Sequence, residues 1–149
     1  MDQKDNILKL EKNTVTPETY FKMRNAVHWK ALSKTQAEKA LANSLCTFCV
    51  TLAGQPIGMA RLVGDGAVIC YVQDLIIHPN AQGMGVGTML LEAVIREVED
   101  LTEPGTEMML DLMCAKGREG FYERFGFVAR PTDTLGPGMI QYVRKSQER

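Results

Sequence analysis

The chain has 149 residues, of which 45% are hydrophobic and 23% are charged, and its formal net charge is −1. These values predict a single globular domain over residues 1–149 and exclude a chain that is disordered throughout. The lack of a basic block argues against nucleic-acid and membrane partners, and no apolar run approaches the roughly 20 residues of a membrane helix. The N-terminal residues lack the regions of a signal peptide, so we expect a cytoplasmic protein.

The first part of the chain predicts one strand and two helices. Residues 7–10 alternate apolar with charged side chains, as a half-buried strand does. Thr16 precedes Pro17, which is the pattern of a helix N-cap followed by proline at the first helical position. Ser33 has the same capping role for a second helix over residues 34–41.

The connection between these two helices contains His28 and Trp29, the latter being the only tryptophan of the chain. An aromatic side chain in such a connection often anchors the packing of the helices. Alternatively, the segment forms a lid over a substrate, in which case His28 and Trp29 bind that substrate. Both interpretations stay open at the level of the sequence.

Residues 45–52, 57–63 and 67–77 predict three strands of an antiparallel meander, since runs of apolar and β-branched residues alternate with turn sequences. The last of these strands is long enough to splay or bulge. In the first of them, Cys46 and Cys49 form a Cys-x-x-Cys pair. Without a second pair or a nearby histidine they do not complete a zinc site, so we expect buried free thiols and no metal.

A glycine-rich turn follows, and apolar residues at helical spacing then predict a long helix that ends at Leu101. Residues 108–113 predict the next strand, and the sequence strand, helix, strand implies a right-handed parallel crossover. Beyond it we expect a short helix over residues 117–125 and two final strands over residues 127–129 and 139–144.

The turn before the long helix contains Gly83, Gly85 and Gly87, after a strand that Pro79 terminates. Such a turn forms an anion site, because the first helical amides have no intrahelical partner and lie at the positive end of the helix dipole. A plain tight turn is the alternative. The spacing is not that of a dinucleotide fingerprint, and Thr88 stands where a P-loop has lysine.

Two motifs together resemble the signatures of the GNAT superfamily of acetyl-CoA-dependent N-acetyltransferases. The first is Gln-x-x-Gly-x-Gly at residues 82–87, preceded by Asp-Leu-Ile-Ile-His-Pro at residues 74–79. The second is Phe-Tyr-x-x-x-Gly-Phe at residues 121–127. The predicted elements match the family over nearly the whole chain. The resemblance implies an α/β (α+β) fold with a mixed central sheet of about seven strands, helices on both faces and a splay between strands four and five.

The resemblance also implies acetyl-CoA as the cosubstrate, with its pyrophosphate at the amides of the turn. The residues that it places there are Gln82, Gly83, Met84, Gly85, Val86, Gly87 and Thr88. Leu75, Ile76 and Ile77 hold the pantetheine where the two strands separate, because a ligand that pairs free backbone groups is favoured. Phe121 completes the cofactor site, and the Leu75 amide is the candidate oxyanion donor.

For the chemistry, the resemblance places Tyr122 beside the CoA sulfur as the candidate general acid, with plain packing as the alternative. Asp74 is the candidate general base, and its alternative is a structural carboxylate; His78 and a water relay are also open. No Ser-His-Asp or Cys-His arrangement is suggested, so we expect direct transfer without an acyl-enzyme.

The acceptor is expected to be a primary amine of a small molecule. Two alternatives stay open: an enzyme that acetylates proteins or peptides, and a non-catalytic module that binds acyl-CoA. A homodimer that uses the last strands is a further expectation.

Overall fold

The computed structural model describes residues 7–147. Its elements are β1 (Leu8–Lys12), α1 (Pro17–Ala26), α2 (Lys34–Ala42), β2 (Cys46–Leu52), β3 (Gln55–Gly64), β4 (Ile69–Ile77), the short 3₁₀ helix η2 (Pro79–Ala81), α3 (Val86–Leu101), β5 (Met109–Leu112) and α4 (Glu119–Glu123). The chain divides into two compact units between Met113 and Cys114, and each is described by itself. The single domain expected over residues 1–149 stays a prediction.

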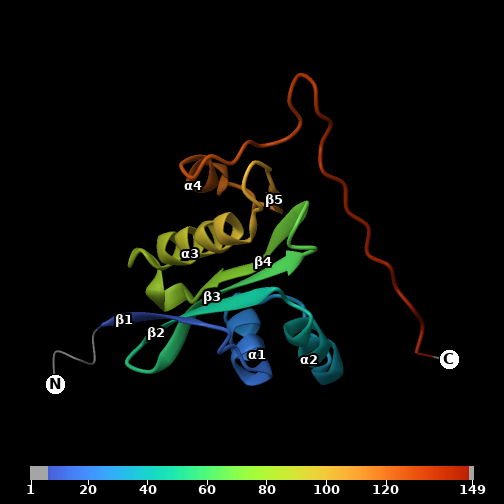
Figure 1. Cartoon of the computed structure of the whole chain (residues 1–149). Coiled ribbons are helices and arrows are strands. Elements are labelled where there is room, and N and C mark those ends of the chain that lie inside the picture. Colours follow the sequence, from blue (N-terminus) through green and yellow to red (C-terminus); the bar gives the residue numbers. More distant parts are fainter. Residues whose placement is uncertain (1–6, 148–149) are drawn as a thin grey trace. The chain divides into compact units, whose positions relative to one another are not determined.

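The first unit contains one mixed sheet with the strand order β1-β2-β3-β4-β5 (Figure 1). Neighbouring strands are antiparallel except for β4 and β5, which are parallel and are connected through α3. The predicted meander and the predicted parallel crossover are therefore confirmed. No described helix is long and apolar enough to cross a bilayer.

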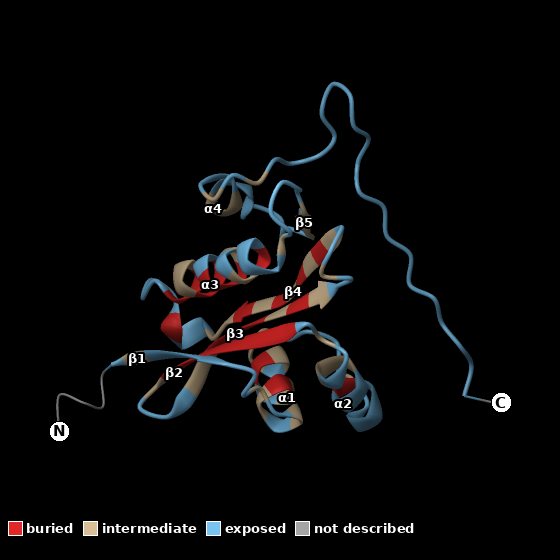
Figure 2. Cartoon of the chain, in the orientation of Figure 1, coloured by how far each residue is buried: buried red, intermediate tan, exposed pale blue. Residues whose placement is uncertain are grey.

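Helices cover both faces of this sheet, with α3 on one side and α1 and α2 on the other (Figure 1). The larger core lies between α3 and the sheet, where the apolar face predicted for α3 is buried (Figure 2). A smaller core lies under α1 and α2 and includes Tyr20, Met23, Met59 and Ile76. Both helices begin as predicted, at the N-caps Thr16 and Ser33, and α2 has a complete capping box.

A β-bulge in β4 changes which residues face which core. Met59 pairs with Ile76 and Arg61 with Gln73, so β4 has one residue more than β3 between these two pairs. Before the bulge, the side chain of Val72 packs into the α3 core. Asp74 within the bulge and Ile76 beyond it contact residues of α1, whereas Leu75 and Ile77 pack against the α3 core. Asp74 has φ 57°, a left-handed conformation that is uncommon for a residue other than glycine.

The sheet has five strands, so the expectation of about seven is wrong. Residues 127–129 and 139–144 form no strand in the described part of the chain. Their local pattern favours β-structure, but a strand also needs a neighbour to pair with, and within the described residues these segments have none. The intervening loop is held by Arg130, whose Nε donates to the carbonyl of Gly136 at 2.6 Å.

The start of β4 also differs from the prediction, since the strand begins at Ile69 and not at residue 67. The carboxylate of Asp65 accepts the amides of Ala67, Val68 and Ile69 at 2.8, 2.8 and 3.0 Å. These hydrogen bonds hold the segment in a turn and lower the pKa of Asp65.

Candidate functional site

The glycine-rich turn connects β4 to α3 through η2. The Nδ1 atom of His78 accepts the amide of Asn80 at 3.1 Å, which fixes the end of β4. Gly83 and Gly85 have φ 83° and 79°, in the left-handed region that favours glycine. A Cβ atom at either position would meet no atom within 4 Å. The backbone conformation therefore requires these glycines, and the space over the turn is open.

The N-terminus of α3 has no side-chain cap. Its N-cap residue is Gly85, and its first turn contains no acidic residue. Gly87, predicted as part of the turn, lies inside α3 and is buried, whereas residues 82–85 are exposed. The first amides of α3 thus have no side-chain acceptor and lie at the positive end of a helix of 16 residues. This end of α3 suits an anionic group that approaches from solvent.

The adjoining half of β4 has an unpaired edge. β5 pairs with β4 only from Ile69 to Val72, while β4 continues to Ile77. On this side, residues 73–77 have no neighbouring strand in the described sheet. Their backbone N–H and C=O groups need partners, and an extended ligand with amide groups can supply them.

Gly58 on β3 sets how closely α3 approaches the sheet. A Cβ atom on Gly58 would lie 2.4 Å from Cγ1 of Val86 and 3.2 Å from Cδ1 of Leu90. Gly58 pairs with Ile77, the last residue of β4. The absence of a side chain at Gly58 therefore lets the first turn of α3 sit directly against the end of β4.

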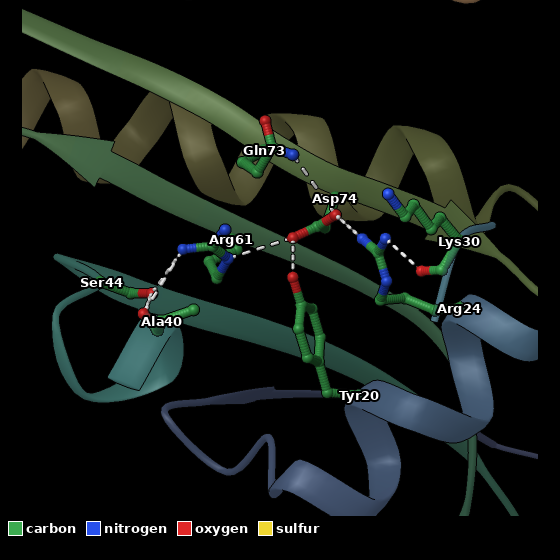
Figure 3. Close-up of polar contacts among 8 residues, drawn as sticks. All are labelled: Tyr20, Arg24, Lys30, Ala40, Ser44, Arg61, Gln73 and Asp74. Carbon is green, nitrogen blue, oxygen red and sulfur yellow. Dashed lines mark hydrogen bonds and ion pairs between the residues drawn. The ribbon is translucent and has the colours of Figure 1, made fainter. Parts of the chain in front are cut away.

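Asp74 lies at the centre of a buried polar cluster between the sheet and α1 (Figure 3). Its carboxylate accepts from the Tyr20 hydroxyl, from Nη1 of Arg24 at 3.0 Å and from Nε of Arg61 at 3.1 Å. A further contact, at 3.5 Å, comes from the side chain of Gln73. Burial and the hydrogen bond to Asp74 raise the pKa of Tyr20.

Arg24 connects this cluster to the segment between α1 and α2. Its Nη2 donates to the carbonyl of Lys30 at 2.8 Å, and its guanidinium lies over the rings of Tyr20 and Trp29 at 5.7 and 5.5 Å. The Nε atom of Arg24 is buried without a hydrogen-bond partner. Trp29 is thus held on one face by Arg24, although 41% of the residue is exposed. His28 is exposed and has φ 60°.

The second unit contains the Phe-Tyr motif. Tyr122 lies in α4 and contacts Phe121 and Phe127 edge to face, with ring centroids 5.1 and 6.0 Å apart. Gly126 has φ 91° and follows the end of α4, where the amide of Phe127 donates to the carbonyl of Tyr122 at 3.3 Å. Burial raises the pKa of Tyr122. The phenol therefore stays protonated at neutral pH and is available as a proton donor.

The model of the acetyltransferase (GNAT) domain family matches residues 43–129. This match includes β2 to β5, the glycine-rich turn and the Phe-Tyr motif. The chain belongs to the GNAT family. GNAT acetyltransferases use acetyl-CoA as their cosubstrate.

Curated relatives agree with this assignment. Over 96 residues the chain is 35% identical to serotonin N-acetyltransferase 2, chloroplastic, of Oryza sativa subsp. japonica, which covers 64% of this chain and 44% of that protein. An uncharacterized N-acetyltransferase of Prochlorococcus marinus is 32% identical over 110 residues, or 71% of this chain and 59% of that protein. The chain spans about half the length of these two relatives.

Solved GNAT structures have the same fold. A probable acetyltransferase of meticillin-resistant Staphylococcus aureus superposes with a TM-score of 0.78 at 26% identity, covering 91% of this chain and all of that one. The predicted GNAT family and mixed sheet are therefore confirmed, with the number of strands corrected to five.

The residues predicted to hold the cofactor fall into two groups. Leu75, Ile76, Ile77 and residues 82–88 follow one another on the continuous path from β4 through the turn into α3. Phe121 belongs with Tyr122 to the second unit. Their roles in binding and catalysis stay predictions.

Sequence reasoning did not find the cluster around Asp74. Tyr20 and Asp74 are 54 residues apart in the chain, and Arg24 and Asp74 are 50 apart. The only local signal is the spacing of Tyr20 and Arg24, which lie one helical turn apart on α1 and so on the same face of that helix. The carboxylate of Asp74 already accepts three hydrogen bonds from Tyr20, Arg24 and Arg61, which favours the structural interpretation of this residue over a general base.

Proposed function

We propose that the protein transfers an acetyl group from acetyl-CoA directly to the primary amine of a small molecule. The observation that carries this proposal is the adjacency of two unsatisfied backbone regions, the uncapped start of α3 and the free edge of β4. The start of α3 suits a phosphate, and the free edge of β4 suits an amide-containing chain. Acetyl-CoA contains a pyrophosphate followed by the amide-containing pantetheine.

On this proposal, the pyrophosphate of CoA binds over the turn at residues 82–88. The space above Gly83 and Gly85 is open, and the first amides of α3 point to it with the positive end of the helix dipole. Gln82 is exposed beside the turn and adds neutral hydrogen bonds in place of a charge. The affinity of the site then rests mainly on backbone amides.

The pantetheine would lie along the free edge of β4 and pair with Leu75 and Ile77, with Ile76 between them. A cofactor role for Phe121 stays a prediction. The amide of Leu75, next to the bulge, would donate to the thioester carbonyl and stabilise the negative charge that develops on its oxygen. Acetyl-CoA supplies the activated acyl group, and these residues hold and orient it.

Transfer requires that the amine nitrogen bonds to the acetyl carbon, that the C–S bond breaks and that the leaving thiolate receives a proton. We propose Tyr122 as the donor of that proton. Its place in the Phe-Tyr motif supports this role, and the phenol is protonated at neutral pH, as an unperturbed tyrosine also is. The amine must also lose a proton. A base role for Asp74 stays a prediction, and it would require the carboxylate to give up one of its present contacts.

A small aromatic amine is the acceptor class that the observations favour. The rice relative is named for serotonin. In this chain, the exposed ring of Trp29, held from behind by Arg24, offers a face on which an aromatic amine can stack. His28 lies beside it. The predicted cytoplasmic location stays a prediction, since the rice relative is named as chloroplastic.

Calorimetry with acetyl-CoA tests the donor site. Gly85→Glu places a negative charge where the pyrophosphate should lie and should abolish the binding heat while unfolding stays cooperative. Gly85→Ala is the matched control, because it shares the strain of the left-handed backbone without the charge. Unchanged affinity in a folded Gly85→Glu variant would refute the donor site.

An acceptor screen that measures release of free CoA tests the reaction. Small aromatic amines should be acetylated, and Tyr122→Phe should lower kcat by about 10²–10⁴-fold with little change in acetyl-CoA affinity. If peptide amines were acetylated and small amines were not, the acceptor would be a protein or peptide. Binding of acetyl-CoA without turnover of any amine would indicate a non-catalytic module.

A further inference from the structure

The peptide between Asp74 and Leu75 is held less firmly by the sheet than its neighbours are. The register between β3 and β4 pairs Gln73 and Ile76 with residues of β3 but skips the two residues between them. On the other side, β5 pairs with β4 only as far as Val72. The regular pairing of the described strands therefore does not fix the direction of this peptide.

The side chain of Asp74 supplies the missing support (Figure 3). Asp74 has φ 57°, and a left-handed residue other than glycine persists only where its surroundings hold it. Its fully buried carboxylate lies between the guanidinium groups of Arg24 and Arg61, at 3.0 and 3.1 Å, and also accepts from the Tyr20 hydroxyl. Because the peptide bond is planar, the backbone angles of Asp74 set the direction of the Leu75 N–H group.

Arg24 also holds residues 28–30, which we call the connecting segment because they join α1 to α2. The carbonyl of Arg24 accepts the amide of Trp29 at 3.0 Å, and its Nη2 atom donates to the carbonyl of Lys30 at 2.8 Å. The guanidinium lies over the Trp29 ring, with Cζ 5.5 Å from the ring centroid. One planar group thus contacts the connecting segment and the Asp74 carboxylate at the same time.

We propose that Arg24 is a positioning residue, which joins the connecting segment to the Leu75 amide through the Asp74 carboxylate. In the proposed function this amide is the oxyanion donor, and the inference rests on the proposed function in that respect. An amine that stacks on Trp29 then acts on the guanidinium behind the ring, and the guanidinium acts on the carboxylate and its peptide. Occupation of the acceptor face and orientation of the oxyanion donor are thereby coupled.

A misdirected Leu75 amide should slow the transfer more than it weakens acetyl-CoA binding. The thioester oxygen gains its negative charge on the way to the transition state, so the donor is needed most there. Arg24→Lys keeps the positive charge but not the planar fork that reaches both partners, nor its stacking on Trp29. Loss of a whole oxyanion donor lowers kcat by about 10²–10³-fold, and we expect a loosened donor to lower it by about tenfold or more.

Amide NMR spectra of the full chain without ligands test the connection itself. Trp29→Leu should shift the backbone amide signal of Leu75 in the otherwise wild-type chain and should leave it unchanged in an Arg24→Lys background. Arg61→Lys is the matched control background, because Arg61 donates to the same carboxylate and otherwise to atoms at the end of α2. The shift caused by Trp29→Leu should persist in that background.

Two outcomes of the NMR comparison would overturn the proposal. If Trp29→Leu left the Leu75 signal in place in the otherwise wild-type chain, the two positions would not be connected. If the shift survived in the Arg24→Lys background, the ring would act on Leu75 by a route other than Arg24. Cooperative unfolding in urea verifies that each variant is folded, and Arg24→Gln replaces Arg24→Lys in both experiments if the lysine variant does not fold.

Kinetics with acetyl-CoA and tyramine, a small aromatic amine, test the positioning role. In Arg24→Lys, kcat per folded protein should fall by about tenfold or more, while the calorimetric Kd for acetyl-CoA stays within about threefold. A merely structural role would lower the stability and leave kcat per folded protein unchanged, and that result would overturn the proposal. If the wild-type chain acetylates no amine, the proposed function fails by itself, and the NMR comparison alone decides whether Arg24 connects Trp29 to Leu75.

Discussion

Gly58→Ala should disturb both the stability of the protein and its cofactor site through a single methyl group. The new Cβ atom would lie 2.4 Å from Cγ1 of Val86, whereas carbon atoms in good contact are about 3.5–4.0 Å apart. The side chain of Val86 must therefore withdraw by about 1 Å or more. Val86 is 1% exposed and its β-branched side chain has one preferred rotamer in a helix, so α3 itself has to move.

The expected loss of stability follows from two opposing terms. Overpacking of a core by a methyl group costs about 1–3 kcal/mol, and replacing a strand glycine by alanine returns about 0.5–1 kcal/mol. We therefore expect a net loss of about 1 kcal/mol in the free energy of unfolding, within a range of about 0–2.5 kcal/mol, measured by urea denaturation. A shift of about 1 Å at the start of α3 should also weaken acetyl-CoA binding by calorimetry, since misplacements of this size are costly at functional sites.

The double variant Gly58→Ala/Val86→Ala is the control, because it removes the methyl group that the new side chain strikes. The two substitutions should be less destabilising together than the sum of their separate effects. Strictly additive losses, or a Gly58→Ala variant with wild-type stability and affinity, would show that the contact between Gly58 and α3 does not position the site.

The buried Asp74 and Cys46, the half-buried Tyr122 and the exposed ring of Trp29 give further expectations. Asp74→Asn should cost about 3–5 kcal/mol in urea unfolding, because it leaves two guanidinium groups without their carboxylate; a loss below 1 kcal/mol would contradict that role. Because burial raises the pKa of Tyr122, the rate of acetyl transfer should not fall through loss of this proton below about pH 10. A fall in the rate that is centred below about pH 10 in the wild type and is absent in Tyr122→Phe would contradict this expectation. Burial raises the pKa of Cys46 to about 11, so about 0.1% of it is thiolate at pH 8. In native protein, Ellman's reagent should therefore react quickly with Cys114 alone, and Cys114→Ser should abolish the fast phase. Finally, Trp29→Ala should raise KM for the amine far more than KM for acetyl-CoA; a fall in stability with both constants fixed would identify a packing anchor.

Features that depend on neighbouring residues could be predicted from the sequence. Thr16 and Ser33 cap their helices as expected, because a cap is a contact across three residues. The predictions of a glycine-rich turn before α3 and of a buried apolar face on that helix were also correct, since glycine conformation and helical spacing are local properties. The family followed from two such local motifs.

Features that depend on distant partners could not be predicted. The strand propensity of residues 139–144 is genuine, but the sequence does not say which edge such a segment pairs with, and the described sheet has five strands. The partners of Asp74 come from α1 and β3, far along the chain. The length of the strand predicted over residues 67–77 indicated a splay or bulge, but not its position. The adjacent polar residues Gln73 and Asp74 interrupt the alternation where the bulge lies.

The bulge also limits how β3 and β4 can misalign during folding. In a regular hairpin, a slip by two residues restores the facing of every side chain, so a misaligned pair can persist. Here the bulge changes which alternate residues of β4 face the α3 core, from Val72 before it to Leu75 and Ile77 after it. The extra residue must therefore stand opposite Ala60 for both faces of β4 to be buried correctly. Any slip would bury the Asp74 carboxylate away from its arginines or expose apolar residues of one half. The pairing of these central strands therefore has a single low-energy alignment, which disfavours trapped intermediates with shifted strands.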